Sequence, residues 1–152
     1  MPRIDIDKAP TRFGTGYPPP YDAPCLGRRR WKLGDAAGLT QYGVNHKRLP
    51  PGQWTSQRHW PTAEDEFVFM LEGEAVLVED EGETILRPGD FAAWKAGVPN
   101  GHHLQNRGER DAVYLEVGSR KPDTDDCDYP DIDMITGPEG YHHRDGRPYP
   151  ED

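Results

Sequence analysis

The chain has 152 residues, of which 34% are hydrophobic and 30% charged, which is enough for one domain around a single core. Its 18 lysine and arginine residues against 27 aspartate and glutamate residues give a net charge of −9, which disfavours nucleic acid and acidic membranes as partners. Its apolar runs are far shorter than the roughly 20 residues of a membrane-spanning helix, and the N-terminal sequence lacks the apolar core of a signal peptide. We therefore expect a soluble cytoplasmic protein. Cys25 and Cys127 lie 102 positions apart and form no paired metal motif, so we expect two free thiols.

The N-terminal segment, residues 1–38, is rich in proline and glycine, including the run Tyr17-Pro18-Pro19-Pro20-Tyr21. Proline fixes φ and lacks a backbone N–H, so helices and central strands are disfavoured and we expect an extended arm. The run Arg28-Arg29-Arg30 lies in this arm. We interpret it as a strap that carboxylates hold, and we assign it no catalytic role.

Residues 39–120 consist of short apolar or alternating runs separated by turn residues such as Pro88-Gly89-Asp90. In such turns proline presets φ and glycine permits positive φ. No helical periodicity lies between the runs, which indicates an antiparallel β-sandwich or barrel and argues against an α/β fold. The predicted strands are residues 42–49, 67–71, 75–78, 84–86, 91–94, 102–105 and 112–117.

Residues 121–152 form an acidic tail, with ten aspartate and glutamate residues against three lysine and arginine residues. A segment of such charge is commonly disordered. This tail also contains apolar side chains, among them Tyr129, Ile132, Met134 and Tyr141. We therefore expect it to be ordered and non-helical, packed on the barrel or on a partner subunit.

Two blocks within residues 52–106 have the spacing of known sequence motifs. The matching positions are Glu66, Gly73, Gly89, Gly97, His102 and Asn106. In this pattern the chain resembles the cupin superfamily. The resemblance implies an all-β fold, the antiparallel jelly-roll or double-stranded β-helix barrel. It also implies a homodimer with covered sheet edges.

Three side chains in these blocks are candidate metal ligands: His59, Glu66 and His102. Two imidazoles and a carboxylate on one inward face of a barrel can bind a divalent ion such as Zn, Mn, Fe, Co or Ni. The cupin pattern has a second histidine two positions after the first, where this chain has Pro61, and a proline where it has Lys95. Two interpretations stay open: a three-ligand metal site, or a vestigial site whose side chains hydrogen-bond to one another or to water.

Several neighbours of these candidates have alternative roles. Gln57 or His103 could complete a coordination sphere. Adjacent strand residues point to opposite faces, however, so we expect His103 on the outer face or at the mouth. Glu64 and Asp65 are interpreted as solvated turn charges, with orientation of His59 as the alternative.

Aromatic side chains of the central zone divide between a pocket and the core. Tyr42, Trp54, Trp60 and Trp94 are expected to line a ligand pocket, because small barrels keep an open mouth. Most of the other large side chains should pack inside the barrel. The candidate core residues are Phe67, Phe69, Leu71, Val76, Val78, Phe91, Trp94, Tyr114 and Val117.

Three functions fit this pattern. The first is a cupin that binds a divalent metal and a small oxygenated molecule of sugar or carboxylate type, with metal-dependent catalysis open. The second is a metal-free binding or sensor protein in which Pro61 marks a lost ligand. The third is a structural homodimer without catalysis. No nucleophile motif or glycine-rich phosphate loop is present, so no catalytic residue and no organic cofactor is assigned.

Overall fold

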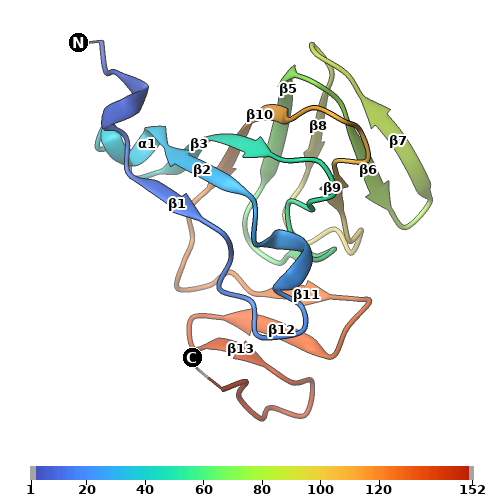
Figure 1. Ribbon diagram of the computed structural model, residues 1–152. Coiled ribbons are helices and arrows are strands. Elements are labelled where there is room, and N and C mark those ends of the chain that lie inside the picture. Colours follow the sequence, from blue (N-terminus) through green and yellow to red (C-terminus); the bar gives the residue numbers. More distant parts are fainter. Residues whose placement is uncertain (1–2, 151–152) are drawn as a thin grey trace.

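The computed structural model describes residues 3–150, which fold mainly into β-strands. The strands form three sheets in which every strand pair is antiparallel. Two sheets enclose a common core, and the third lies beside one end of this barrel (Figure 1). No helix of the described residues is long and apolar enough to cross a membrane. The expected all-β antiparallel barrel is confirmed.

The largest sheet supplies one wall of the barrel. Its strands, in spatial order, are β1 (Thr11–Phe13), β2 (Arg29–Lys32), β3 (Tyr42–Leu49), β10 (Ala112–Ser119), β5 (Glu66–Glu72) and β8 (Phe91–Trp94). Tyr114 of β10 is opposite Lys47 on one side and Met70 on the other, so the three side chains share one face. That shared face is the inner one, because Tyr114 and Met70 are buried.

The opposite wall is a three-stranded sheet of β7 (Gly82–Leu86), β6 (Ala75–Glu79) and β9 (His103–Gln105). Side chains from both walls interlock in one apolar cluster. Its buried members are Leu49, Val68, Met70, Ala75, Leu77, Leu86, Leu104, Ala112 and Tyr114. Burial of this apolar surface stabilises the barrel, at roughly 25 cal/mol per Å².

The register of β5 differs from the expected core. Val68 and Met70 are buried, whereas Leu71 is 37% exposed and Phe91, on the neighbouring strand, is 64% exposed. Side chains alternate along a strand, so an inward Glu66 requires Val68 and Met70 to point inward and Phe67 and Phe69 to point outward. The prediction that Phe67, Phe69, Leu71 and Phe91 form the core was therefore wrong.

The segment predicted to be an extended arm contributes two strands to the large sheet. β2 pairs with β3 along four residues, and β1 pairs with β2. The prolines of the segment lie outside these strands. Every residue within the strands therefore has a backbone N–H group that can pair. Short helical turns η1 (Ile6–Lys8), η2 (Ala23–Cys25) and α1 (Leu33–Ala36) complete the segment, whose residues 1–2 lie outside the described part of the chain.

The arginine run does not form the expected carboxylate-held strap. Arg29 packs over the rings of Phe13 and Trp31, with its guanidinium carbon 4.7 and 4.4 Å from the two ring centres. Arg28 donates hydrogen bonds to backbone carbonyls. Within residues 3–150, no ion pair of Arg28, Arg29 or Arg30 with a carboxylate is formed.

The acidic tail contains three strands, the last of which ends at His142, and residues 151–152 lie outside the described part. Its strands β11 (Cys127–Tyr129), β12 (Met134–Gly137) and β13 (Gly140–His142) join β4 (Trp60–Pro61) in a four-stranded sheet. Tyr129 and Met134 pack with Tyr17 and Cys25 in a second apolar cluster. Both cysteines are free, as expected.

Two motif positions have structural roles. Gly73 adopts a φ of +67°, and a Cβ there would lie 2.3 Å from the carbonyl oxygen of Asp111, so only glycine fits the turn. Asn106 is buried, and its amide donates to the carbonyls of Leu49 and Arg110, both at 2.8 Å. These contacts hold the loop between β9 and β10 to the end of β3.

Candidate functional site

A cavity of about 210 Å³ opens between the two walls of the barrel. Most of the side chains around it are polar or aromatic, which is unusual for the interior of a small barrel. The lining residues are Tyr17, Arg28, Lys47, Thr55, Ser56, His59, Glu66, Val68, Trp94, His102, His103, Leu104, Tyr114 and Glu116. The three candidate metal ligands are all among them.

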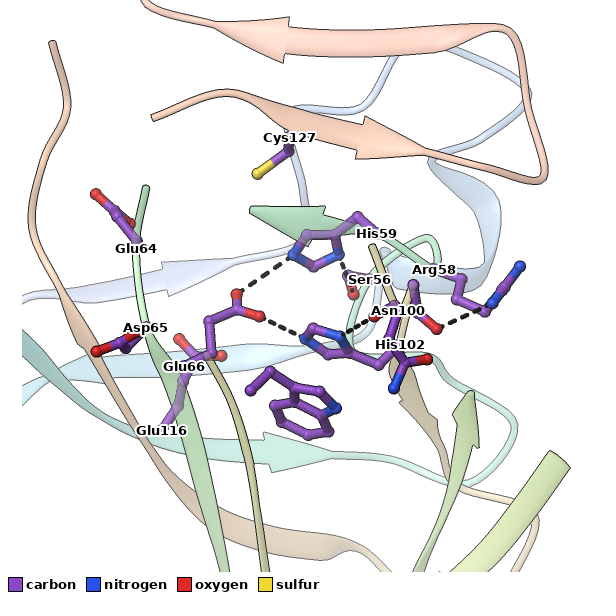
Figure 2. Close-up of polar contacts among 12 residues, drawn as sticks. Ser56, Arg58, His59, Glu64, Asp65, Glu66, Asn100, His102, Glu116 and Cys127 are labelled. Carbon is purple, nitrogen blue, oxygen red and sulfur yellow. Dashed lines mark hydrogen bonds and ion pairs between the residues drawn. The ribbon is translucent and has the colours of Figure 1, made fainter. Parts of the chain in front are cut away.

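Glu66 lies between the two candidate histidines, as Figure 2 shows. One carboxylate oxygen is 3.4 Å from Nε2 of His59, and the other is hydrogen-bonded to Nε2 of His102. Glu66 is on β5, whereas His59 and His102 face each other in an isolated antiparallel bridge. Three separate chain segments therefore bring the three side chains together.

Each imidazole is held through its other ring nitrogen. Nδ1 of His59 lies 2.9 Å from the carbonyl oxygen of Gln57, and Nδ1 of His102 lies 2.9 Å from that of Asn100. A carbonyl oxygen only accepts hydrogen bonds, so both Nδ1 atoms carry a proton. Each Nε2 atom therefore faces Glu66 in one of two states. It donates a hydrogen bond if the ring is a protonated imidazolium ion, or it presents a lone pair if the ring is neutral.

The pKa values of Glu66 and His59 are both shifted at this site. Burial alone would raise the pKa of Glu66, but hydrogen bonds and positive charge from His102 and His59 outweigh it and hold this pKa well below its ordinary value. For His59, burial lowers the pKa, and the hydrogen bond and charge of Glu66 more than compensate, so the pKa is raised. The carboxylate is thus fully ionised at neutral pH.

Further contacts fix the position of His102. The indole of Trp94 stacks on its imidazole with ring centres 3.8 Å apart and an angle of 1°. The Trp94 Nε1 donates to Glu79 at 2.8 Å, and Asn100 donates to the same carboxylate oxygen at 3.1 Å. Glu79 therefore anchors both the residue that stacks on His102 and the residue whose carbonyl binds it.

Of the four aromatic residues expected to line the pocket, only Trp94 contacts this cavity. Tyr42 begins β3 and is 45% exposed, in a shallow groove outside the barrel wall. Trp54 packs edge-on against His103, with ring centres 4.9 Å apart. Trp60 directly follows His59, and adjacent residues of an extended segment point to opposite sides. The assignment of Tyr42, Trp54 and Trp60 to this cavity is therefore corrected.

The neighbouring candidates also occupy definite positions. His103, expected on the outer face or at the mouth, is buried and lines the cavity, with Nδ1 2.8 Å from the carbonyl oxygen of Ser56. Gln57 donates to the carbonyl of Tyr21. Glu64 and Asp65 accept hydrogen bonds from the backbone N–H groups of Lys121 and Ala96 at 2.6 and 2.8 Å, so neither orients His59.

Pro61 lies where the fourth ligand of the cupin pattern is expected. It is buried in β4 and pairs with Cys127 of the tail. Figure 2 shows Cys127 on the tail side of the site. Burial and nearby carboxylates raise the pKa of its thiol far above its ordinary value, so this sulfur remains protonated at neutral pH.

Sequence reasoning missed the charged residues on the other side of the cavity. Lys47 of β3 is buried and forms an ion pair with Glu116 of β10 at 2.6 Å. Arg28 precedes β2 and also lines the cavity. The alternation of β10 around Tyr114 could have indicated that Glu116 points inward, whereas no local pattern indicated where Arg28 would lie.

The three candidate ligands fit a divalent ion by donor type. Two imidazole nitrogens and one carboxylate suit a borderline ion, and hydrogen bonds from Nδ1 to carbonyls are the usual support of metal-bound histidine. Among residues 3–150, no group of three or more histidine, cysteine, aspartate or glutamate side chains has the arrangement of a preformed metal site. In this conformation Glu66 is hydrogen-bonded to His102 and paired with His59, so an ion would have to replace these direct contacts between the three side chains.

Comparisons with known proteins agree with this architecture. Residues 45–118 match a family model described as the cupin domain. A sugar phosphate isomerase from a cupin superfamily, of Silicibacter pomeroyi, is 44% identical, with 98% of this chain and 97% of that chain covered and a TM-score of 0.91. A comparison with curated proteins finds no match.

Two further solved structures are similar over most of their length. A provisionally assigned sugar phosphate isomerase of Acidithiobacillus ferrooxidans is 28% identical, with 76% of this chain and 74% of that chain covered and a TM-score of 0.70. A polyketide cyclase of Streptomyces resistomycificus is 16% identical, with 80% of each chain covered and a TM-score of 0.62. The last similarity concerns the fold alone.

Replacement of Glu66 by glutamine tests the electrostatics of the site. The variant Glu66→Gln keeps the shape of the side chain but removes its charge, so the largest compensation for the burial of His59 is lost. We expect the pKa of His59 to fall relative to that of the unmodified protein, both treated with chelator and measured by NMR titration of the imidazole C–H signals. The matched variant Glu64→Gln should leave the His59 titration unchanged. An unchanged or higher pKa of His59 in Glu66→Gln would contradict this description.

Proposed function

This chain belongs to the cupin superfamily, and we propose that it binds a divalent metal ion together with a small oxygenated molecule in the barrel cavity. The observation that carries the proposal is the convergence of His59, Glu66 and His102 at one point of the cavity wall. Both histidines turn Nε2 to that point because their Nδ1 atoms are bound elsewhere. Three protein ligands with positions left for solvent or substrate are typical of catalytic rather than structural metal sites.

The residues around the triad suit a substrate with hydroxyl, carbonyl or carboxylate oxygens. A divalent ion at such a site supplies Lewis-acid chemistry toward a bound oxygen atom. Ser56, Thr55 and His103 add polar groups, and Trp94 adds a flat apolar surface next to His102. The name of the relative from Silicibacter pomeroyi, a sugar phosphate isomerase, favours a molecule of sugar type for this chain too.

A metal-free binding protein is the second candidate, and Pro61 is the observation that favours it. In this case the imidazoles and Glu66 would remain an internal hydrogen-bonded cluster, and the cavity would bind its ligand without an ion. The two candidates differ in one measurable property, the metal content of the purified chain.

Elemental analysis of untagged protein purified without chelator separates them. We expect about one ion per chain, and a loss of this ion in His59→Ala and in His102→Ala, because two donors do not hold a divalent ion firmly. His142→Ala, in the tail, is the matched control and should keep the ion. Less than about a tenth of an ion per chain, unchanged by these variants, would contradict the proposal. In that case, a gain of metal by Pro61→His would identify a site abandoned through loss of its fourth ligand.

We also propose that the protein is a homodimer through the outer face of the six-stranded sheet. On this face Leu115 is opposite Phe69, Val117 is opposite Phe67, and Phe69 is opposite Phe91. The rings of Phe67 and Phe91 stack with centres 5.7 Å apart. Phe91 is 64% exposed, and the other four side chains are partly exposed. Contiguous apolar side chains of this kind are typical of protein interfaces, and a twofold axis would let the same face cover itself.

Light scattering after size-exclusion chromatography tests the dimer. We expect twice the chain mass of 17.2 kDa for the unmodified protein and the single mass for Phe91→Asp, because a buried unpaired carboxylate at the interface is costly. Ile85→Asp, at an exposed isoleucine on β7 of the three-stranded sheet, should remain dimeric. A single mass for the unmodified protein, or a dimer of Phe91→Asp, would contradict this interface.

A further inference from the structure

We propose that Arg28 and Lys47 form an anion subsite in the barrel cavity, which binds the carboxylate or phosphoryl group of a short polyol ligand. Both side chains line the same cavity as His59, Glu66 and His102. The inference deepens the proposed function and rests on it for the location of the ligand, but it does not depend on a bound metal ion.

The order of the strands separates the two groups of charges. Arg28 immediately precedes β2, Lys47 is on β3, and Glu66 is on β5. Two strands, β3 and β10, lie between β2 and β5. At about 4.8 Å per strand, the backbones of β2 and β5 are about 14 Å apart along the curved wall. A ligand can therefore meet a cation on one side of the cavity and the triad on the other.

Arg28 carries a positive charge that no carboxylate compensates directly. Its Nε donates to the carbonyl of Gly14 at 2.8 Å, and its Nη1 donates to the carbonyl of Thr55. These backbone contacts fix the guanidinium without neutralising it. Its Nη2 makes no hydrogen bond within residues 3–150, so one terminal nitrogen remains for a ligand.

The nearby charges leave an excess of cations on this side. Lys47 is paired with Glu116, which also accepts a hydrogen bond from Asn45 at 3.3 Å. The pKa of Lys47 is lowered mainly by burial. The positive charges of Arg28 and of Arg30, which is half-buried on β2, lower it further. Within the described part of the chain, Glu116 is thus the one carboxylate beside three cations, Arg28, Arg30 and Lys47. Buried and half-buried cations in excess favour an anion, and a guanidinium suits planar or tetrahedral oxyanions.

The size of the cavity limits the ligand. An apolar cavity of about 150 Å³ accommodates benzene, which has six non-hydrogen atoms. By proportion, the 210 Å³ cavity encloses about eight such atoms, and a larger ligand must extend through the opening. A three-carbon polyol with one anionic group matches this volume.

Calorimetric titration of the chelator-treated protein with three matched probes tests the subsite. Glycerol, glycerate and glycerol 3-phosphate share a three-carbon frame and carry no charge, a carboxylate or a phosphoryl group. We expect at least one charged probe to bind about tenfold or more tightly than glycerol, as charge-assisted hydrogen bonds imply. The comparison of glycerate with glycerol 3-phosphate shows which oxyanion the subsite prefers.

Variants then assign the preference to Arg28. Arg28→Gln should remove most of the difference between the charged probe and glycerol, and Arg28→Lys should retain part of it. Arg107→Gln removes the same charge from a side chain outside the cavity, paired with Glu83, and should bind like the unmodified protein. Circular dichroism must show that each variant is folded, and the probe comparison in the unmodified protein does not depend on any variant.

Two results would overturn the inference: equal affinities for glycerol and for both charged probes, or an unchanged preference in folded Arg28→Gln. Metal content, measured on the same preparations before chelation, separates this failure from failure of the proposed function. A bound ion without anion preference would contradict the subsite alone. Anion preference without a bound ion would contradict the metal site and support the subsite.

Discussion

The position of Glu66 between two imidazoles is the constraint on which the rest of the site depends. A buried carboxylate is costly unless partners compensate its charge, and here both oxygens face a histidine Nε2. Backbone carbonyls fix the opposite edge of each ring, and Trp94 fixes the plane of His102. Several elements of the fold therefore orient three donor groups toward one point, and this arrangement suits a divalent ion.

Much of this arrangement was predictable from local patterns. Turn residues separated the strands, and the spacing of Glu66 from Gly73 and of His102 from Asn106 indicated a cupin barrel. The same spacing selected Glu66 and His102, and counting back from Glu66 selected His59; all three line the cavity. These predictions succeeded because turn chemistry and strand alternation act over a few residues and are written directly into the sequence.

The remaining features depend on long-range packing. Glu66 already required Val68 and Met70 to face inward, yet the larger Phe67 and Phe69 were assigned to the core on hydrophobicity alone. The path of the N-terminal segment, which brings Arg28 into the cavity, is set by pairing of β2 with β3 across a separate part of the chain. No periodicity within Arg28-Arg29-Arg30 could indicate which arginine would turn inward.

The most direct test of the metal-binding account is anomalous diffraction from crystals grown with manganese, recorded on both sides of the manganese absorption edge. The account predicts an anomalous peak in the barrel cavity, bounded by His59 Nε2, His102 Nε2 and the carboxylate of Glu66. A cavity without such a peak, in crystals whose solution contains the ion in excess, would contradict the account and leave these three side chains as an internal hydrogen-bonded cluster.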